Sequence, residues 1–152
     1  MVLFLLKFIF GIHKMNSVIL YNYPEKIMNK RRGHYCRICG SRKPNEAFSG
    51  KGHRIHVCKK CALLPKEKRE EIEQKDEIFN YLRQSHISDK NMSRLRKLTA
   101  SPNEQVAELA GVVLEVAEIR PYKKRRLKEL ARKNRDLLRK LDETGLILAH
   151  RW

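Results

Sequence analysis

The stretch CRICGSRKPNEAFSGKGHRIHVCKKC, residues 36–61, contains all four cysteines of the 152-residue chain. They form two pairs, Cys36 with Cys39 and Cys58 with Cys61, and 18 residues lie between the pairs. Two C-x2-C pairs at this separation are typical of a zinc site. A tight turn can place both thiolates of a pair on one metal, and four sulfur ligands suit tetrahedral Zn²⁺. We therefore predict that these four cysteines hold a structural Zn²⁺ as the cofactor.

Neighbouring residues favour this interpretation. Gly40 follows the first pair, where a tight turn often needs a residue that tolerates positive φ. Lys59 and Lys60 lie inside the second pair, where their charge favours the thiolate form of the cysteines. Two disulfides would be typical of an exported domain, and no export signal is evident. A redox dithiol needs one pair only and would leave the second pair unexplained.

The segment between the pairs has turn-forming residues where a β-hairpin would need them. Residues 44–45 and 49–52 are typical of turns, and residues 47–48 suit an incoming strand. Residues 53–57 alternate between polar and apolar side chains, as in a strand with one buried face. The sequence thus predicts a hairpin between the cysteine pairs and a helix from Pro65 onward. The predicted core residues of the module are Ile38, Phe48, Ile55 and Val57.

A cysteine knuckle, a hairpin and a second cysteine pair that leads into a helix resemble the treble-clef class of zinc fingers, with the zinc ribbon as the alternative. Residues 31–61 also resemble a segment of small uncharacterised bacterial zinc proteins, which implies no activity. Treble-clef nucleases of the His-Asn-His kind carry Asp or His before the catalytic histidine. Here Gly52 precedes His53 and Ile55 precedes His56. We therefore assign no catalytic residue and expect no enzyme activity.

The rest of the chain is predicted to be helical. Expected helices begin at Pro65, at Ser88 or Asp89, and at Ser101, the last with a Ser-Pro-Asn-Glu start signal. Residues 122–143 are expected to form one basic helix that ends before Gly145. Residues 88–119 resemble one HEAT-like helix pair. The expected fold class is a small α+β zinc module, treble clef or zinc ribbon, followed by an all-α helical region.

This pattern divides the chain into three parts. Residues 1–27 form an apolar N-terminal extension, which we interpret as non-native. Its apolar run over residues 2–12 is too short for a membrane-spanning helix. Residues 28–64 form the four-cysteine zinc module, and residues 65–152 form a helical bundle that ends in a basic helix.

The charge of the chain favours a polyanionic partner. Lys and Arg number 34 against 17 Asp and Glu, which gives a net charge of +17. Residues 28–66 contain eleven basic residues and one acidic residue, and residues 120–152 contain twelve and four. Between them, residues 101–119 contain four acidic residues and no basic ones. Basic blocks of this kind favour nucleic acid ahead of membrane lipid.

The sequence therefore predicts a cytoplasmic, zinc-binding, non-enzymatic nucleic-acid-binding protein, with RNA slightly favoured over DNA. We expect no small-molecule substrate and no membrane partner. The alternative is a protein-interaction adaptor that binds a protein partner through the helices of residues 88–119, and a treble-clef nuclease is third. The residues expected to contact nucleic acid are Arg31, Arg32, Lys51, Arg54, His56, Lys59, Lys60, Lys123, Lys124, Arg125 and Arg126.

Overall fold

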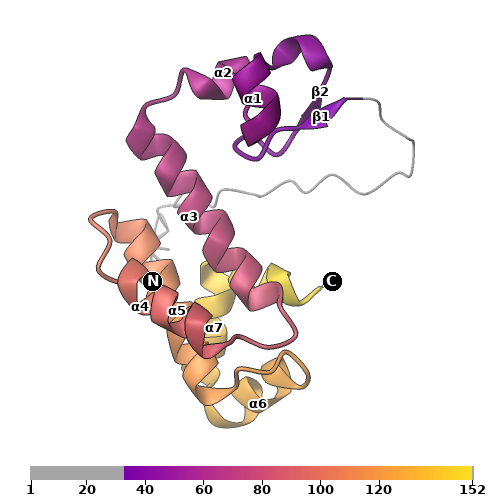
Figure 1. Cartoon of the computed structure of the whole chain (residues 1–152). Coiled ribbons are helices and arrows are strands. Elements are labelled where there is room, and N and C mark those ends of the chain that lie inside the picture. Colours follow the sequence, from indigo (N-terminus) through magenta and orange to yellow (C-terminus); the bar gives the residue numbers. More distant parts are fainter. Residues whose placement is uncertain (1–32, 152) are drawn as a thin grey trace, which may run out of the picture.

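A computed structural model of the chain describes residues 33–151. The predictions about residues 1–27, Arg31 and Arg32 lie outside the described residues. Figure 1 shows a small module at one end of the molecule, a helical bundle at the other, and the long helix α3 (Lys66–Arg83) running between them. The order of a small mixed module and then a helical region follows the expectation from sequence.

The small module begins with a short antiparallel sheet. Strand β1 (His34–Tyr35) pairs with β2 (Arg42–Lys43), with His34 opposite Lys43. The turn between the strands carries the first cysteine pair. The next elements are a 3-10 turn, η1 (Asn45–Ala47), and two short helices, α1 (Gly50–Ile55) and α2 (Lys59–Ala62).

The predicted hairpin between the cysteine pairs is wrong, because α1 occupies its second turn and second strand. Ser49 starts this helix, since its hydroxyl oxygen accepts a hydrogen bond of 2.9 Å from the backbone N–H of Gly52. A side-chain cap of this kind satisfies a donor that has no partner within the helix. The helix ends at His56, which has a left-handed backbone with φ 54°. The alternation of residues 53–57 therefore does not mark a strand.

The module has a small core of its own. Ile38, Phe48 and Val57 are buried together with the cysteines Cys36, Cys58 and Cys61. Ile55 was also expected there, but it is 37% exposed because it lies on the outer side of α1. This core therefore contains few apolar side chains besides the cysteines.

Helix α3 confirms the helix predicted after Pro65 and belongs to both ends of the molecule. Ile72, in its first half, packs against the core of the module. Ile78 and Leu82, in its second half, are buried in the core of the helical bundle. An ion pair of 3.1 Å between Arg37 and Glu73 adds a polar link between module and helix.

The bundle consists of α4 (Asp89–Leu98), α5 (Glu104–Ile119), α6 (Arg126–Lys133), α7 (Arg135–Glu143) and the 3-10 helix η2 (Leu146–His150). The expected start of α4 is confirmed, because the Ser88 hydroxyl accepts from the N–H of Asn91 at 3.3 Å. Helix α5 starts at Asn103 rather than at Ser101, since Asn103 Oδ1 accepts from the N–H of Val106 at 3.1 Å.

The predicted single basic helix over residues 122–143 is wrong. The chain breaks at Asn134, whose φ of −141° and ψ of 64° are not helical, and α6 and α7 lie on either side of it. The break directs Leu130 of α6 and Leu141 of α7 into one core. Gly145 follows α7 with φ 73°, as expected of a residue just after a helix.

The core of the bundle is continuous and apolar, with Leu95, Val113 and Leu141 among its fully buried members. The amphipathic pair α4 and α5 packs against α3 and α7 around this core. No helix in residues 33–151 has the length and apolar character needed to cross a membrane.

Candidate metal centre and cationic surfaces

The four cysteine sulfur atoms converge. Each lies within 4.8 Å of the others, and Cys39 alone of the four is exposed. In a tetrahedral centre, Zn–S bonds of about 2.3 Å place the sulfur atoms about 3.8 Å apart. Small side-chain adjustments would therefore close the cluster around one ion. The predicted ligand set fits a tetrahedral metal with soft ligands.

The first pair is held by a tight turn. The N–H of Cys36 donates to Ser41 O and the N–H of Gly40 donates to Cys36 O, both at 2.9 Å. Gly40 has φ 65°, which a residue with a Cβ rarely adopts. A third bond, from the N–H of Arg37 to His56 O at 2.9 Å, ties this turn to the end of α1. The turn and the α1 terminus therefore position the first two sulfur atoms.

The second pair lies at the start of α2. Cys58 is the N-cap residue, and Cys61 lies within the helix three positions later. Residues with this spacing share one side of a helix, so both sulfur atoms point toward the first pair. Cysteines leading into a helix were expected here.

Two donors stabilise negative charge on the sulfurs. Lys43 Nζ lies 3.2 Å from Cys58 Sγ, and the N–H of Cys58 donates to Cys36 Sγ at 3.3 Å. Burial acts to raise the pKa of Cys58, but hydrogen bonds from the Cys61 N–H and from Lys43 lower it to about 6. Burial and the other cysteines raise the pKa of Cys61. A divalent cation would compensate the thiolate charge that a single lysine only partly balances.

Lys43 is the site residue that sequence reasoning missed. It lies fifteen positions before Cys58 and reaches it because β2 folds back beside β1. The sequence marks Lys43 only by its positive charge, and many neighbouring residues have the same charge, so nothing in the sequence singles it out.

Two histidines of the module, His34 and His53, pack against each other and against Phe48. The His34 ring lies 4.6 Å from that of His53 and 5.7 Å from that of Phe48, between centroids. Within residues 33–151, the four cysteines are the one group of three or more His, Cys, Asp or Glu side chains with metal-binding spacing.

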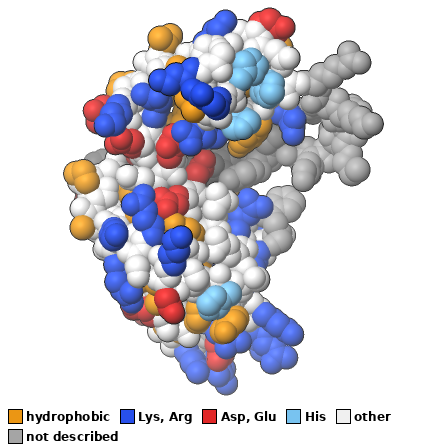
Figure 2. Space-filling model, viewed as in Figure 1, with side chains coloured by type: hydrophobic (Ala, Val, Ile, Leu, Met, Phe, Trp, Pro, Cys, Tyr) orange, Lys and Arg blue, Asp and Glu red, His pale blue; other side chains and the backbone are white. Residues whose placement is uncertain are grey.

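The described residues of the module that are predicted to contact nucleic acid have exposed side chains. They lie on α1 and α2 and just after α1, and all are exposed: Lys51, Arg54, His56, Lys59 and Lys60. On the face shown in Figure 2, Lys and Arg side chains lie over this end of the molecule, over its middle and at the lower end. No carboxylate of residues 33–151 lies within ion-pair distance of Lys51, Arg54, Lys59 or Lys60.

The second predicted cluster, residues 123–126, does not present one surface. Lys124 and Arg125 are exposed and Lys123 is half-buried, but Arg126 is wholly buried. The prediction that Arg126 contacts nucleic acid is therefore wrong.

The Arg126 guanidinium is held by backbone carbonyls. It donates to Leu82 O at 2.8 Å, to Arg120 O at 3.0 Å and to Pro121 O at 2.5 Å. It also lies 3.3 Å from His150 Nε2. Burial, and then the positive charge of Arg120, lower the pKa of Arg126 to about 10. Arg126 thus joins α3, the α5–α6 connection and η2, and it has a structural role.

Comparisons of the chain with profiles of known protein families, with curated proteins and with solved structures give no match.

Proposed function

We propose that this protein is a non-enzymatic nucleic-acid-binding protein whose N-terminal module is organised by a structural Zn²⁺. The observation that carries the proposal is the charge of the module. Lys51, Arg54, Lys59 and Lys60 are exposed on α1 and α2 of the module that holds the four clustered cysteines, and Glu46 is the one carboxylate in residues 33–65. A cationic surface without compensating carboxylates favours a polyanion.

The helical part contrasts with the module. Many of its cations pair with carboxylates of the same part, as in Arg94 with Glu77 at 3.0 Å and Lys140 with Glu115 at 3.6 Å. Charges already balanced in this way attract a polyanion less. The contrast supports the module as the main contact surface.

Within zinc-finger classes, we propose a treble-clef-like arrangement. A knuckle on a hairpin supplies the first pair, and the start of a helix supplies the second, which favours a treble clef over a zinc ribbon. Helix α1 replaces the hairpin that would normally lie between them.

The adaptor alternative finds less support. In the helices of residues 88–119, the apolar side chains pack into the bundle, and Ile119 is their one large hydrophobic residue that is exposed. A protein partner would therefore find little apolar surface on this pair.

The experiment is a salt series of binding to fluorescent RNA and DNA oligonucleotides. With about six phosphate contacts, log K should fall against log salt with a slope of about −4 for a single strand and about −5 for B-DNA. A variant in which Lys51, Arg54, Lys59 and Lys60 are all replaced by Gln should reduce the single-strand slope by about three units.

The matched control replaces four exposed cations of the helical part, Lys90, Arg96, Lys97 and Lys140, by Gln. This control removes the same number of positive charges and should leave most of the slope of log K against log salt unchanged. Equal losses in both variants would indicate a response to net charge alone. If the wild-type protein shows no salt-sensitive binding near 0.1 M salt, the adaptor function replaces this proposal.

A further inference from the structure

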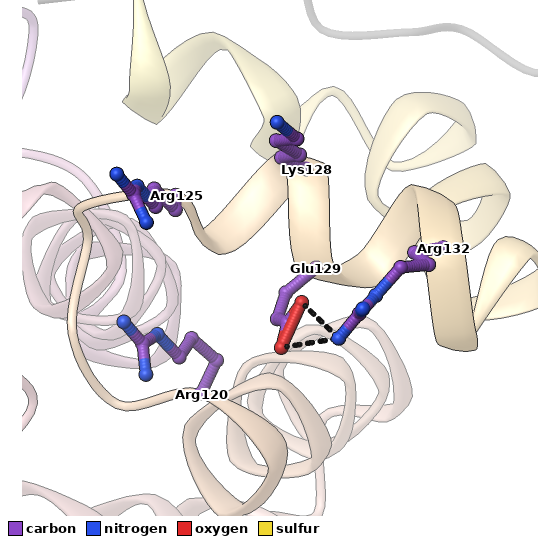
Figure 3. Close-up of a pocket in the computed structure, with 5 residues that line it drawn as sticks. All are labelled: Arg120, Arg125, Lys128, Glu129 and Arg132. Atoms are coloured by element: carbon purple, nitrogen blue, oxygen red, sulfur yellow. Dashed lines mark hydrogen bonds and ion pairs between the residues drawn. The ribbon is translucent and has the colours of Figure 1, made fainter.

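A second cationic site lies at the opposite end of the molecule, where α5 ends and α6 begins. A cavity of about 330 Å³ is lined there by Arg120, Arg125, Lys128, Glu129 and Arg132. This volume is at the lower end of the range of about 300–1,000 Å³ for ligand pockets. Figure 3 shows Arg120 and Arg125 on one side, Glu129 paired with Arg132 on the other, and Lys128 extending from α6 away from Glu129.

The charges of this cavity are not balanced. Glu129 is its one carboxylate, and it pairs with Arg132 at 3.1 Å. Lys133, outside the cavity, lies 3.5 Å from the same carboxylate. Loss of hydration acts to raise the pKa of Glu129, but the charges of Arg132 and Lys133 lower it. The Glu129 carboxylate is therefore already paired with Arg132 and Lys133.

The remaining cations lack partners of opposite charge. No carboxylate of the described residues lies within ion-pair distance of Arg120, Arg125 or Lys128. Arg120 Nε is also buried without a hydrogen-bond partner in the described part of the chain. Like charges around one space repel, and an oxyanion between them would accept several charged N–H donors. The cavity therefore has the chemistry of a phosphate site.

An exposed aromatic pair adjoins this cavity. Tyr122 is 54% exposed, and its ring lies 4.5 Å from the His86 ring, between centroids. The two residues are fixed by a β-bridge between their backbones. The Arg120 guanidinium carbon lies 5.8 Å from the centre of the Tyr122 ring, so Arg120 connects the aromatic pair to the cavity.

Proteins that bind single-stranded nucleic acid combine these two features. Cations follow the backbone phosphates, and exposed aromatic rings stack on unpaired bases. In a duplex, each base is already stacked and paired, so an exposed ring gains little from it. A cationic cavity with an adjacent exposed ring can therefore discriminate single-stranded from double-stranded nucleic acid, which a cationic surface alone cannot do.

We propose that this cavity binds one backbone phosphate of single-stranded nucleic acid and that the adjacent base stacks on Tyr122. This inference rests on the proposed function and adds to it a second contact site and a preference for single strands. Arg125 and Lys128 are the exposed cations of the site, and Arg120 is the half-buried one.

The test uses the full chain with its metal and two probes, a single-stranded oligouridylate and an RNA duplex of the same length. The cavity variant combines Arg125→Asn, which tolerates the left-handed backbone at this position, with Lys128→Gln. The stacking variants are Tyr122→Leu and Tyr122→Phe. The charge-matched control combines Lys90→Gln with Lys97→Gln on exposed positions of α4.

We expect the cavity variant to reduce the single-strand salt slope by about one unit, and more than the control does. Tyr122→Leu should weaken single-strand binding about tenfold without changing the slope, because it removes stacking and no charge. Duplex binding should be unchanged by Tyr122→Leu, and Tyr122→Phe should bind single strands as the wild type does.

Wild-type binding that neither the cavity variant nor Tyr122→Leu weakens beyond the control would overturn this inference and leave the proposed function standing. An absence of salt-sensitive binding to either probe would overturn both. Vesicles of phosphatidylcholine with and without phosphatidylserine provide a third arm. Cavity-dependent binding to the anionic vesicles, without oligouridylate binding, would identify a lipid headgroup as the ligand and overturn the inference.

Discussion

Arg126 is wholly buried, whereas the neighbouring cations Lys124 and Arg125 are exposed. Residues 123–126 are four consecutive cations, and nothing in their order distinguishes the last one. Its acceptor at Leu82 lies 44 residues away and is brought close only when α3 packs against the bundle. Sequence alone therefore identified a cationic cluster but not which member is buried. The same limit explains why Lys43 was missed beside Cys58.

We predict that Arg126→Leu destabilises the protein by about 3 kcal/mol, because it leaves several buried carbonyl groups without their donor. Arg126→Lys should also destabilise, since one ammonium group cannot reproduce the planar set of donors. The measurement is urea unfolding followed by circular dichroism. Lys124→Gln, on an exposed neighbour, should change stability by less than about 0.5 kcal/mol. A similarly small effect of Arg126→Leu would contradict the structural role.

His150 gives a pH-dependent prediction. Burial, with the charges of Arg126 and Lys123, lowers its pKa to about 4. In the unfolded chain, a histidine titrates near about 6.5. Below that pH the unfolded state binds a proton that the folded state does not. Neutral, buried His150 therefore contributes fully to the free energy of unfolding above about pH 6.5, and this contribution is lost as the pH falls toward 4.

Because His150 retains partial contact with solvent, we expect this loss to be about 1–2 kcal/mol rather than the full value of the shift. His150→Gln keeps an acceptor for Arg126 but does not titrate. Its free energy of unfolding should fall less between about pH 7 and 4.5 than that of the wild type. His86→Gln, at an exposed position, should retain the wild-type dependence. Identical pH profiles for wild type and His150→Gln would contradict the assignment.

At the scale of elements, the sequence predicted α3 and α4 well but missed α1 and the break between α6 and α7. Helices α3 and α4 have apolar periodicity and clear start signals, so their positions were predictable. Helix α1 has six residues, too few for a helical period to stand out against an alternating pattern. The break at Asn134 lies inside a basic segment whose leucines continue on both sides, so periodicity gave no sign of it.

The two glycines of α1 provide a matched test of its packing. A Cβ at Gly52 would lie 2.6 Å from Val57 O, whereas a Cβ at Gly50 would meet nothing within 4 Å. Gly52→Ala should therefore displace the segment before Cys58 and weaken metal binding about tenfold or more, equivalent to a destabilisation of about 1.4 kcal/mol.

Gly50→Ala should keep wild-type affinity or increase it slightly, since alanine restricts the unfolded chain. The measurement is competition for zinc with a chromophoric chelator. If both variants bind zinc equally well, the close approach at Gly52 does not control the site.

At the scale of the whole molecule, helix α3 contributes to two hydrophobic cores of unequal size. The core of the bundle is large and apolar and includes the second half of α3. The core of the module depends on its cysteines, with Ile38, Phe48 and Val57 as its other buried hydrophobic residues. Cores this small rarely sustain a fold without a metal or disulfides. We therefore expect the fold of the module to depend on metal and the fold of the bundle not to.

The most direct measurement is a residue-resolved NMR comparison of the full chain before and after the metal is removed with a chelator. Structural zinc in small modules contributes about 10–16 kcal/mol of apparent binding energy, far more than this core can replace. We predict that, without metal, the amide signals of residues 33–64 shift to the values of an unfolded chain, whereas those of α4 to α7 keep their native values. Addition of one equivalent of zinc should restore the original spectrum. Cys58→Ser should reproduce the metal-free spectrum. Native chemical shifts for residues 33–64 in the metal-free protein would contradict the account.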